Sequence, residues 1–188
     1  MKSIFLIGFM ASGKTTLGRA LAAAMPGVRF IDLDEAIEAE AGRSVADIFA
    51  DEGEAAFRRI ESDVLRKVSH CDSIIACGGG TPCRPENMDF MLEAGSVIYL
   101  TATSDRIVQR LQEAPPGRRP LVDALLDNTE KLKEYVDNMI ASRECYYKRA
   151  HHTFDANRLD TKEQIDASVK DFTARFMSSY SQNRLNTE

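Results

Sequence analysis

A glycine-rich stretch near the start of the chain has the residue types and the spacing of a phosphate-binding loop. Residues 8–15 match the pattern G-x-x-x-x-G-K-[ST] and follow a short apolar run. Glycines let such a loop fold around a polyphosphate with its N–H groups inward, at the positive end of the next helix. There Lys14 reaches the β- and γ-phosphates and the hydroxyl of Thr15 binds Mg²⁺. The alternative, a glycine turn that binds nothing, leaves Lys14 without a use.

A pair of aspartates follows the second apolar segment, in "VRFIDLD". If residues 28–34 form a strand, side-chain alternation points Asp32 and Asp34 to the same side and Leu33 to the other. One carboxylate then binds Mg²⁺, directly or through water, and the other holds a hydroxyl nucleophile. The alternative is that Asp34 caps the helix that begins at "DEAIEAEA".

Glycines and arginines further along the chain have the chemistry of an anion site. The segment "CGGGTP" (residues 77–82) places three glycines after an apolar run, where a ligand can approach bare backbone amides or where the loop is merely flexible. Arg58 lies in "AAFRRIE" and Arg143 in "MIASRECYYKR". Arg58 also has an ordinary alternative, an ion pair or hydrogen bond to Glu61 or Ser62 along its own helix.

Two more arginines lie in a segment that cannot form regular structure. Arg118 and Arg119 belong to "APPGRRPLV", in which prolines and a glycine surround them. The segment connects two expected helices. Two cations on such a loop are typical of a mobile lid that closes over a phosphoryl group.

The elements that must position these residues alternate between strands and helices. Strands are expected at residues 3–8, 28–34, 72–80, 95–102 and 151–156. Helices are expected at residues 53–69, 85–94, 104–111 and 129–149, and a last one begins with the capping pair Thr161 and Gln164. This alternation predicts an α/β fold with a mostly parallel sheet covered on both faces.

Composition sets limits on the class of protein. A chain of 188 residues, 44% of them hydrophobic, predicts a single domain at residues 1–176, with a loose polar tail at 177–188. A net charge of −5 argues against nucleic-acid binding as the main function. No signal peptide or membrane span is visible, and the cysteines lack paired metal-ligand spacing, so we expect reduced thiols and a cytoplasmic location.

Taken together, these motifs resemble the shikimate kinases, which belong to the nucleoside-monophosphate-kinase-like group of P-loop enzymes. The similarity covers Ser3 to about Phe176. The matching motifs occur in the family's order: the phosphate loop at 8–15, Asp32-x-Asp34, Phe57-Arg58-x-x-Glu61, Gly78-Gly79-Gly80, Arg119-Pro120-Leu121 and Arg143-x-x-x-Tyr147. The resemblance implies a three-layer α/β/α fold with a five-stranded parallel sheet. It also implies substrate-binding helices at about 34–69 and a lid at about 112–126.

The resemblance further implies the role of individual residues and a monomer that acts on shikimate and ATP, with Mg²⁺. Catalytic roles fall to Lys14, Asp34 and Arg119, and Mg²⁺ to Thr15 and Asp32, the latter directly or through water. ATP contacts are implied for Gly8, Ala11, Ser12, Gly13, Lys14, Thr15, Thr16, Arg110 and Arg119, with Arg110 stacking on adenine. Shikimate contacts are implied for Asp34, Arg58, Gly79, Gly80 and Arg143.

Some features depart from the family pattern and leave alternatives open. The connection "QEAPPGR" is longer than usual, so either Arg118 or Arg119 is the lid arginine, and Cys145-Tyr146 replaces the usual Pro-Leu before Tyr147. A kinase of the same fold that acts on another small polyol acid, such as gluconate, is the nearest rival. A nucleotide-dependent switch is a second rival, against which no N-K-x-D segment occurs.

Overall fold

The computed structural model describes residues 2–70, 72–115 and 120–177. Its strands are β1 (Ser3–Ile7), β2 (Arg29–Asp32), β3 (Ser73–Ala76), β4 (Gly95–Thr101) and β5 (His152–Asp155). Its helices are α1 (Lys14–Ala24), α2 (Leu33–Ala41), α3 (Val45–Val68), η1 (Thr81–Cys83), α4 (Pro85–Ala94), α5 (Ser104–Glu113), α6 (Pro120–Asp123), α7 (Thr129–Tyr147) and α8 (Lys162–Phe176).

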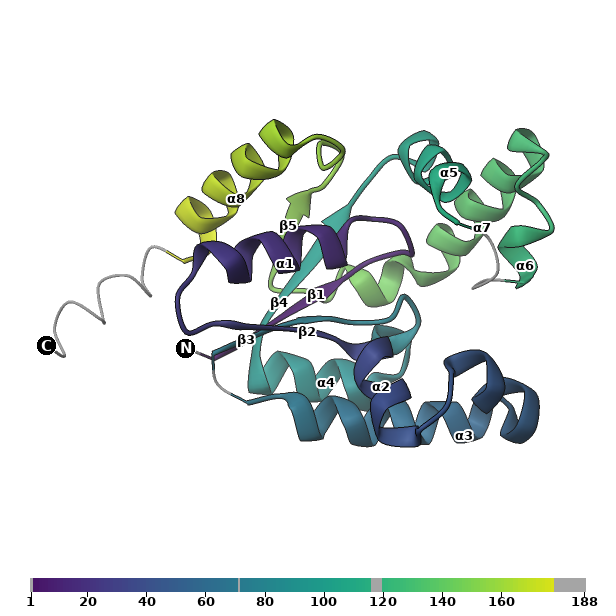
Figure 1. Cartoon of the computed structure of the whole chain (residues 1–188), viewed down its shortest axis with the longest axis horizontal. Coiled ribbons are helices and arrows are strands. Elements are labelled where there is room, and N and C mark those ends of the chain that lie inside the picture. The colour runs from purple at the N-terminus through teal and green to yellow at the C-terminus, as the bar shows by residue number, and fades with distance from the viewer. Residues whose placement is uncertain (1, 71, 116–119, 178–188) are drawn as a thin grey trace, which may run out of the picture.

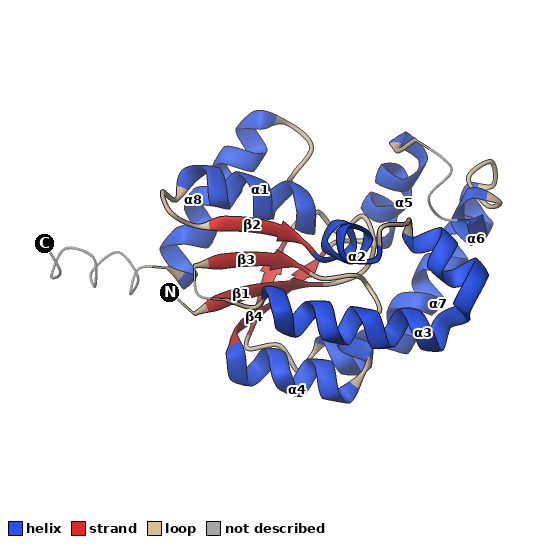
Figure 2. Cartoon of the chain, turned by 60° about the horizontal axis from the view of Figure 1, so that its bottom comes forward, coloured by secondary structure: helices blue, strands red, loops and turns tan. Residues whose placement is uncertain are grey.

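The five strands form one parallel sheet in the order β2-β3-β1-β4-β5 (Figure 2). Strand β1 lies at the centre, with Ile4 opposite Ile74 on one side and Ser96 on the other. All five residues of β1 are buried, because helices cover both faces of the sheet. Central parallel strands are for this reason continuous apolar runs without alternation, and the predicted parallel α/β sheet is confirmed.

Helices α1 and α8 cover one face of the sheet, and α3 and α4 cover the other (Figures 1 and 2). On the first face Leu17, Leu21 and Phe172 pack against apolar side chains of the strands. On the second face Val64, Leu65 and Met91 do the same. Helices α5, α6 and α7 lie beyond the carboxyl ends of the strands, where Phe9 packs against Ile107 and Leu132 (Figure 1). The arrangement is the predicted three-layer α/β/α architecture.

The second strand ends earlier than the sequence analysis predicts. Strand β2 stops at Asp32, and Asp32 caps helix α2, since its carboxylate accepts a hydrogen bond of 3.1 Å from the backbone N–H of Asp34. Asp34 therefore lies in the first helical turn. The strand-alternation argument for the two carboxylates is wrong, as is the alternative that Asp34 is the N-cap.

Helix α3 begins earlier than predicted and contains a break. Ser44 and Asp47 form a capping box before the first turn, so the helix starts at Val45 and not at Gly53. Gly53 interrupts it with φ 77° and ψ 176°, a conformation that is open almost only to glycine. The N-terminal half of α3 thereby takes a direction of its own.

Candidate active site

The loop between β1 and α1 requires glycine at two positions. Gly8 and Gly13 have φ values of 141° and 99°. A side chain at Gly8 would also meet the carbonyl of Leu100 at 2.6 Å, and one at Gly13 would meet Leu159 at 2.5 Å. Ala11 between them has φ 57°, so the loop curls on itself. Such a curl aims successive N–H groups into one concavity, as anion-binding loops do.

Lys14 is the first residue of α1 and lies folded back over this loop. Its side chain is buried, and Nζ donates hydrogen bonds to the carbonyls of Gly8 at 2.9 Å and Phe9 at 2.8 Å. Lys14 therefore does have a use apart from phosphate, and the argument that a simple glycine turn would leave it without one is wrong. The hydroxyl of Ser12 is buried without a hydrogen-bond partner in the described chain, as expected of a donor that faces a phosphate.

Thr15 and Asp32 come together beside this loop. The hydroxyl of Thr15 donates a hydrogen bond of 2.8 Å to Asp32 Oδ2. Both are hard oxygen donors of the kind that Mg²⁺ takes, and the pair fits an ion that keeps its remaining ligands from water and phosphate. Among the described residues no group of three or more His, Cys, Asp or Glu side chains could hold a metal on its own. The site fits Mg²⁺ that arrives with a nucleotide.

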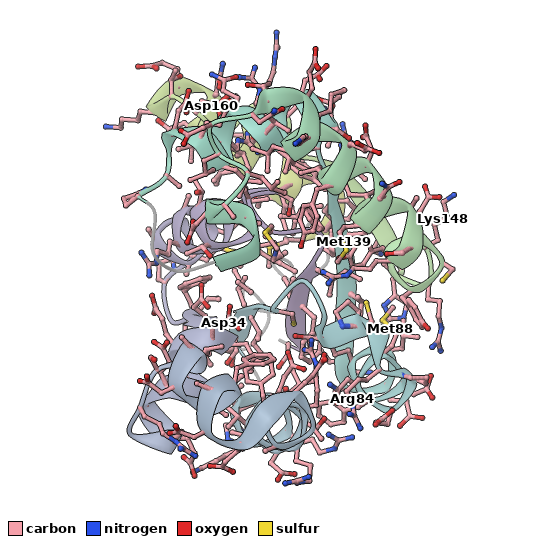
Figure 3. The ribbon with its side chains drawn as sticks, turned by 90° about the vertical axis from the view of Figure 1, so that its right-hand side faces the viewer. Asp34, Arg84, Met88, Met139, Lys148 and Asp160 are labelled. Carbon is pink, nitrogen blue, oxygen red and sulfur yellow. The ribbon has the colours of Figure 1, made fainter. Side chains whose placement is uncertain are left out.

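Asp34 faces the space between the α2–α3 segment and helices α5 to α7 (Figure 3). The pocket walls partly remove the Asp34 carboxylate from water, and this raises its pKa to about 6. The nearby carboxylates of Asp32 and Glu61 shift the pKa in the same direction. The Lys14 ammonium opposes this shift. A carboxyl with a pKa near neutrality is suited to accept a proton from a hydroxyl group.

Arg58 belongs to a buried network that the sequence analysis did not foresee. Its Nη1 donates a hydrogen bond of 2.9 Å to Glu61, whose side chain is 1% exposed. The other oxygen of Glu61 accepts a bond of 2.6 Å from the hydroxyl of Thr81, at the end of the glycine triplet. The ion pair of the ordinary alternative therefore exists, but it anchors Arg58 against the glycine loop. Only the i, i+3 spacing of Arg58 and Glu61 pointed to it.

The glycine triplet lets the loop backbone lie close to two guanidinium groups. A side chain at Gly80 would lie 2.8 Å from Arg58 Nη2, and one at Gly79 would lie 3.4 Å from Arg143 Nη1. The hydroxyl of Tyr147 donates a hydrogen bond of 2.7 Å to the carbonyl of Gly79 and ties the loop to α7. Both guanidinium groups thus lie against the loop backbone. The predicted anion-binding residues are close together.

Two adjoining hollows contain these groups. The inner pocket has a volume of about 190 Å³ and is lined by Met10, Asp34, Val45, Phe49, Phe57, Arg58, Glu61, Gly78, Gly79, Gly80 and Arg143. The outer cavity has a volume of about 550 Å³ and is lined by Glu54, Ala55, Arg58, Gly80, Cys83, Arg84 and Arg143. Arg58, Gly80 and Arg143 line both and form the boundary between them. An apolar wall, two cations and two carboxylates, of which Glu61 is paired with Arg58, make the inner pocket suitable for a small hydroxy acid.

Arg110 lies on the other side of the phosphate loop. It donates a hydrogen bond of 2.9 Å to Asp160, further bonds to the carbonyls of Ala156 and Asn157, and one of 3.4 Å to the carbonyl of Ala11. These bonds hold the guanidinium at the mouth of the loop, where a nucleotide base would follow the phosphates. The contact with adenine itself stays a prediction.

Arg118 and Arg119 lie outside the described residues, as does the centre of the predicted lid at 112–126. Helix α6 begins at Pro120, so the prediction that "APPGRRPLV" cannot form regular structure is wrong for its last three residues. Val122 of α6 packs against the cluster around Phe9. The choice between the two lid arginines therefore stays open.

The break at Gly53 gives a prediction for the inner pocket. Val45 and Phe49 line the pocket from the first half of α3, and Phe57 and Arg58 line it from the second half. We expect Gly53→Ala to change the angle between these walls and to raise the KM of the acid substrate by about three- to tenfold, with the KM of the nucleotide unchanged.

Gly42→Ala is the matched control for this variant. Gly42 has φ 68°, and a side chain at either glycine would meet nothing within 4 Å, so both changes strain the backbone without a clash. Gly42 caps the C-terminus of α2 and is not one of the residues that line the pocket. Equal KM values for the acid in the two variants would show that Gly53 has no positioning role.

Fold and site together define a P-loop phosphotransferase with a separate pocket for a small acid. The sequence matches the family model for shikimate kinase over residues 10–173, and the chain belongs to the shikimate kinase family. It is 38% identical to a shikimate kinase of Parabacteroides distasonis over 166 residues, which is 88% of this chain and 94% of that protein. It is 39% identical to a shikimate kinase of Phocaeicola vulgatus over 170 residues, 90% of this chain and 95% of that protein.

Solved structures give the same result. The crystal structure of shikimate kinase from Bacteroides thetaiotaomicron matches with a TM-score of 0.85 and 34% identity, covering 92% of this chain and 97% of that one. Shikimate kinase from Acinetobacter baumannii, in complex with shikimate, matches with a TM-score of 0.77 and 30% identity, covering 93% and 92% of the two chains. In the described part of the present chain no helix has the length and apolarity needed to cross a bilayer.

Proposed function

We propose that the protein transfers the γ-phosphoryl group of ATP to the 3-hydroxyl of shikimate, giving shikimate 3-phosphate and ADP on the route to chorismate and the aromatic amino acids. The observation that carries this proposal is the position of Asp34. It lines a pocket that also contains two arginines, and it lies close enough to the phosphate-loop lysine for the two charges to interact. An acceptor bound in that pocket would have a hydroxyl facing the phosphate loop.

In the proposed reaction each group has a separate task. Asp34 accepts a hydrogen bond from the 3-hydroxyl of shikimate and takes its proton as the bond to phosphorus forms. Arg58 and Arg143 bind the carboxylate of shikimate, with the amides of Gly79 and Gly80 beside them. Lys14 leaves the loop carbonyls and binds the β- and γ-phosphates of ATP.

The remaining groups serve the nucleotide. The N–H groups of residues 11–16, the Ser12 hydroxyl and the start of α1 surround the phosphates, and Arg110 covers the adenine. Thr15 and Asp32 hold Mg²⁺, which neutralises charge on the phosphates when it is bound. An arginine of the lid, which we assign to Arg119, supplies a further positive charge. We propose a cytoplasmic monomer that needs no partner beyond its two substrates.

A coupled ADP-release assay tests this function against its rivals. ADP release should be fast only when shikimate is present, and slow with quinate, gluconate or nucleoside monophosphates. Fast release with gluconate would favour the other small-acid kinase. Slow release that no acid accelerates would indicate a nucleotide-dependent switch.

Arg58 gives a prediction about substrate identity. Arg58→Lys keeps the charge but loses the planar pair of donors, so we expect the KM of shikimate to rise about three- to tenfold. Arg58→Ala should lower kcat/KM for shikimate by about ten- to a hundredfold or more, since a buried charged hydrogen bond contributes roughly 1.5–3 kcal/mol. The KM of ATP should change little in either variant.

The buried carboxylate of Glu61 complicates the alanine variant, because it loses its cation. The double variant Arg58→Met with Glu61→Gln removes both charges and provides the control. If shikimate kinetics recover in the double variant, Arg58 acts only on stability and does not bind the substrate. Melting temperatures of all three variants separate loss of fold from loss of binding.

A further inference from the structure

The lining of the outer cavity contains more guanidinium groups than carboxylates. Its lining contains the guanidinium groups of Arg58, Arg84 and Arg143 and a single carboxylate, Glu54. The chain as a whole has a net charge of −5, so this is a local concentration of cations in an acidic protein. A volume of about 550 Å³ lies within the range of small-molecule sites, roughly 300–1,000 Å³, and far exceeds the space of a few waters.

The three guanidinium groups differ in how they are paired. Arg143 stacks over the ring of Phe9 at 5.8 Å and forms no ion pair within the described chain. Arg84 donates to Glu86 through Nη2, and its side chain is 38% exposed. Arg58 is the most strongly paired of the three, because Glu61 and Glu54 both accept from it. Arg84 and Arg143 therefore keep donors for a further anion.

Glu54 shows that a carboxylate fits against this side of Arg58. Its Oε1 accepts hydrogen bonds of 3.3 Å from Arg58 Nε and 3.2 Å from Nη2. The Glu54 side chain is 69% exposed, and such exposed pairs are weak, so a ligand can displace it easily. The Glu54 carboxylate thus contacts Arg58 at the outer cavity in the same way that an acid group of a bound ligand would.

From these observations we propose that the outer cavity is a second anion subsite, which binds a further acid group of a ligand whose ring lies in the inner pocket. The ligand class is a ring acid with two anionic groups. One group binds at the boundary formed by Arg58 and Arg143, and the second extends to Arg84. In Figure 3, Arg84 lies apart from Asp34, so such a ligand extends away from Asp34.

This subsite rests on the proposed shikimate pocket and adds to it. A ligand that fills both hollows occupies the place of shikimate but offers no hydroxyl to Asp34 unless its ring carries one. Dianionic ring acids should therefore inhibit by competing with shikimate and not with ATP. Monoanionic ring acids of the same size reach only the inner pocket.

Benzoate and isophthalate are the probes, because they share one ring and differ by a single carboxylate. Their inhibition constants against shikimate are measured at constant ionic strength, and their binding to the nucleotide-free protein by calorimetry. We expect isophthalate to bind about tenfold more tightly than benzoate. Calorimetry needs no turnover, so it decides the subsite even if the proposed reaction is wrong.

Two variants that should change the preference for isophthalate in opposite directions, and one control variant, complete the experiment. Arg84→Gln should reduce the preference for isophthalate to about threefold or less, and Glu54→Gln should increase it severalfold, because a competing carboxylate is lost. Arg59→Gln makes the same charge change as Arg84→Gln at an exposed position outside both hollows and should leave the preference unchanged. Equal affinities for the two probes, an equal loss in the Arg59 and Arg84 variants, or competition with ATP would overturn the proposal.

Discussion

Replacement of Lys14 by methionine is expected to lower kcat by about a thousandfold while the protein stays folded. The ammonium group of Lys14 is the positive charge that the proposed mechanism places on the β- and γ-phosphates, where charge develops during transfer. Removal of a single preorganised donor of this kind costs about a hundred- to a thousandfold in rate, which is roughly 3–4 kcal/mol. Methionine retains the length and the buried stem of the side chain.

The structure adds a smaller effect on stability. Lys14 donates to the carbonyls of Gly8 and Phe9, and both bonds are lost in the variant, although the Phe9 carbonyl still accepts a bond of 3.2 Å from the Ser12 N–H. We expect a loss of about 1–2 kcal/mol in the free energy of unfolding, measured by denaturant titration. Lys162→Met, at an exposed position of α8, is the control and should change neither quantity. Near-normal turnover in Lys14→Met would mean that this loop is not the ATP site.

The sequence predicted best the features that depend on local pattern. Central strands such as β1 are buried on both faces, so their apolar runs are unambiguous, and the phosphate loop has a fixed spacing between strand and helix. The α4 bounds were also predicted correctly, since Pro85 starts that helix and Gly95 follows its last residue. In each case the deciding residues are adjacent in the chain.

The errors occurred where two local signals compete. The sequence predicts a strand that ends at Asp34, with a helix start there as the alternative, and capping by Asp32 decided the outcome. Gly53 read as a helix boundary because glycine weakens a helix, but the chain continues as helix on both sides of it. Neither result follows from periodicity alone.

The network around Glu61 could not be predicted because it depends on tertiary contacts. Glu61 is buried and accepts a hydrogen bond from Thr81 of η1, twenty residues away in sequence. The two readings of Arg58, as a surface ion pair or as a substrate ligand, were treated as alternatives. In the structure the ion pair with Glu61 is what holds Arg58 in the pocket wall, so the two are parts of one arrangement.

Asp34→Asn is expected to lower kcat by about a hundred- to a thousandfold and to make the free protein more stable at neutral pH. The loss of rate follows from removal of the general base. In the parent enzyme kcat/KM for shikimate should fall as pH decreases through about 6, because the pKa of Asp34 is raised to about 6 and the protonated form cannot accept the proton. The variant should lack this acidic limb.

The gain in stability has a definite dependence on pH. The pKa of Asp34 is higher in the folded protein, about 6, than its ordinary value of 3.8, so the folded state holds the proton more tightly. Ionisation therefore destabilises the fold progressively as pH rises from 3.8 to about 6, and the full cost persists above that. This pKa difference corresponds to about 3 kcal/mol, but Asp34 is exposed to water in the pocket, and screening reduces the expected effect to about 1 kcal/mol.

The measurement is the free energy of unfolding of parent and variant between pH 4 and pH 8. Asp34→Asn should be more stable than the parent by about 1 kcal/mol at pH 7.5, and the difference should vanish towards pH 4, where the parent carboxyl is protonated. Glu93→Gln removes one negative charge at an exposed position of α4. It should show neither the gain in stability nor the loss of activity. A variant that loses activity but gains no stability at neutral pH would mean that Asp34 is not held in an unfavourable ionised state, and that its role in catalysis does not depend on a raised pKa.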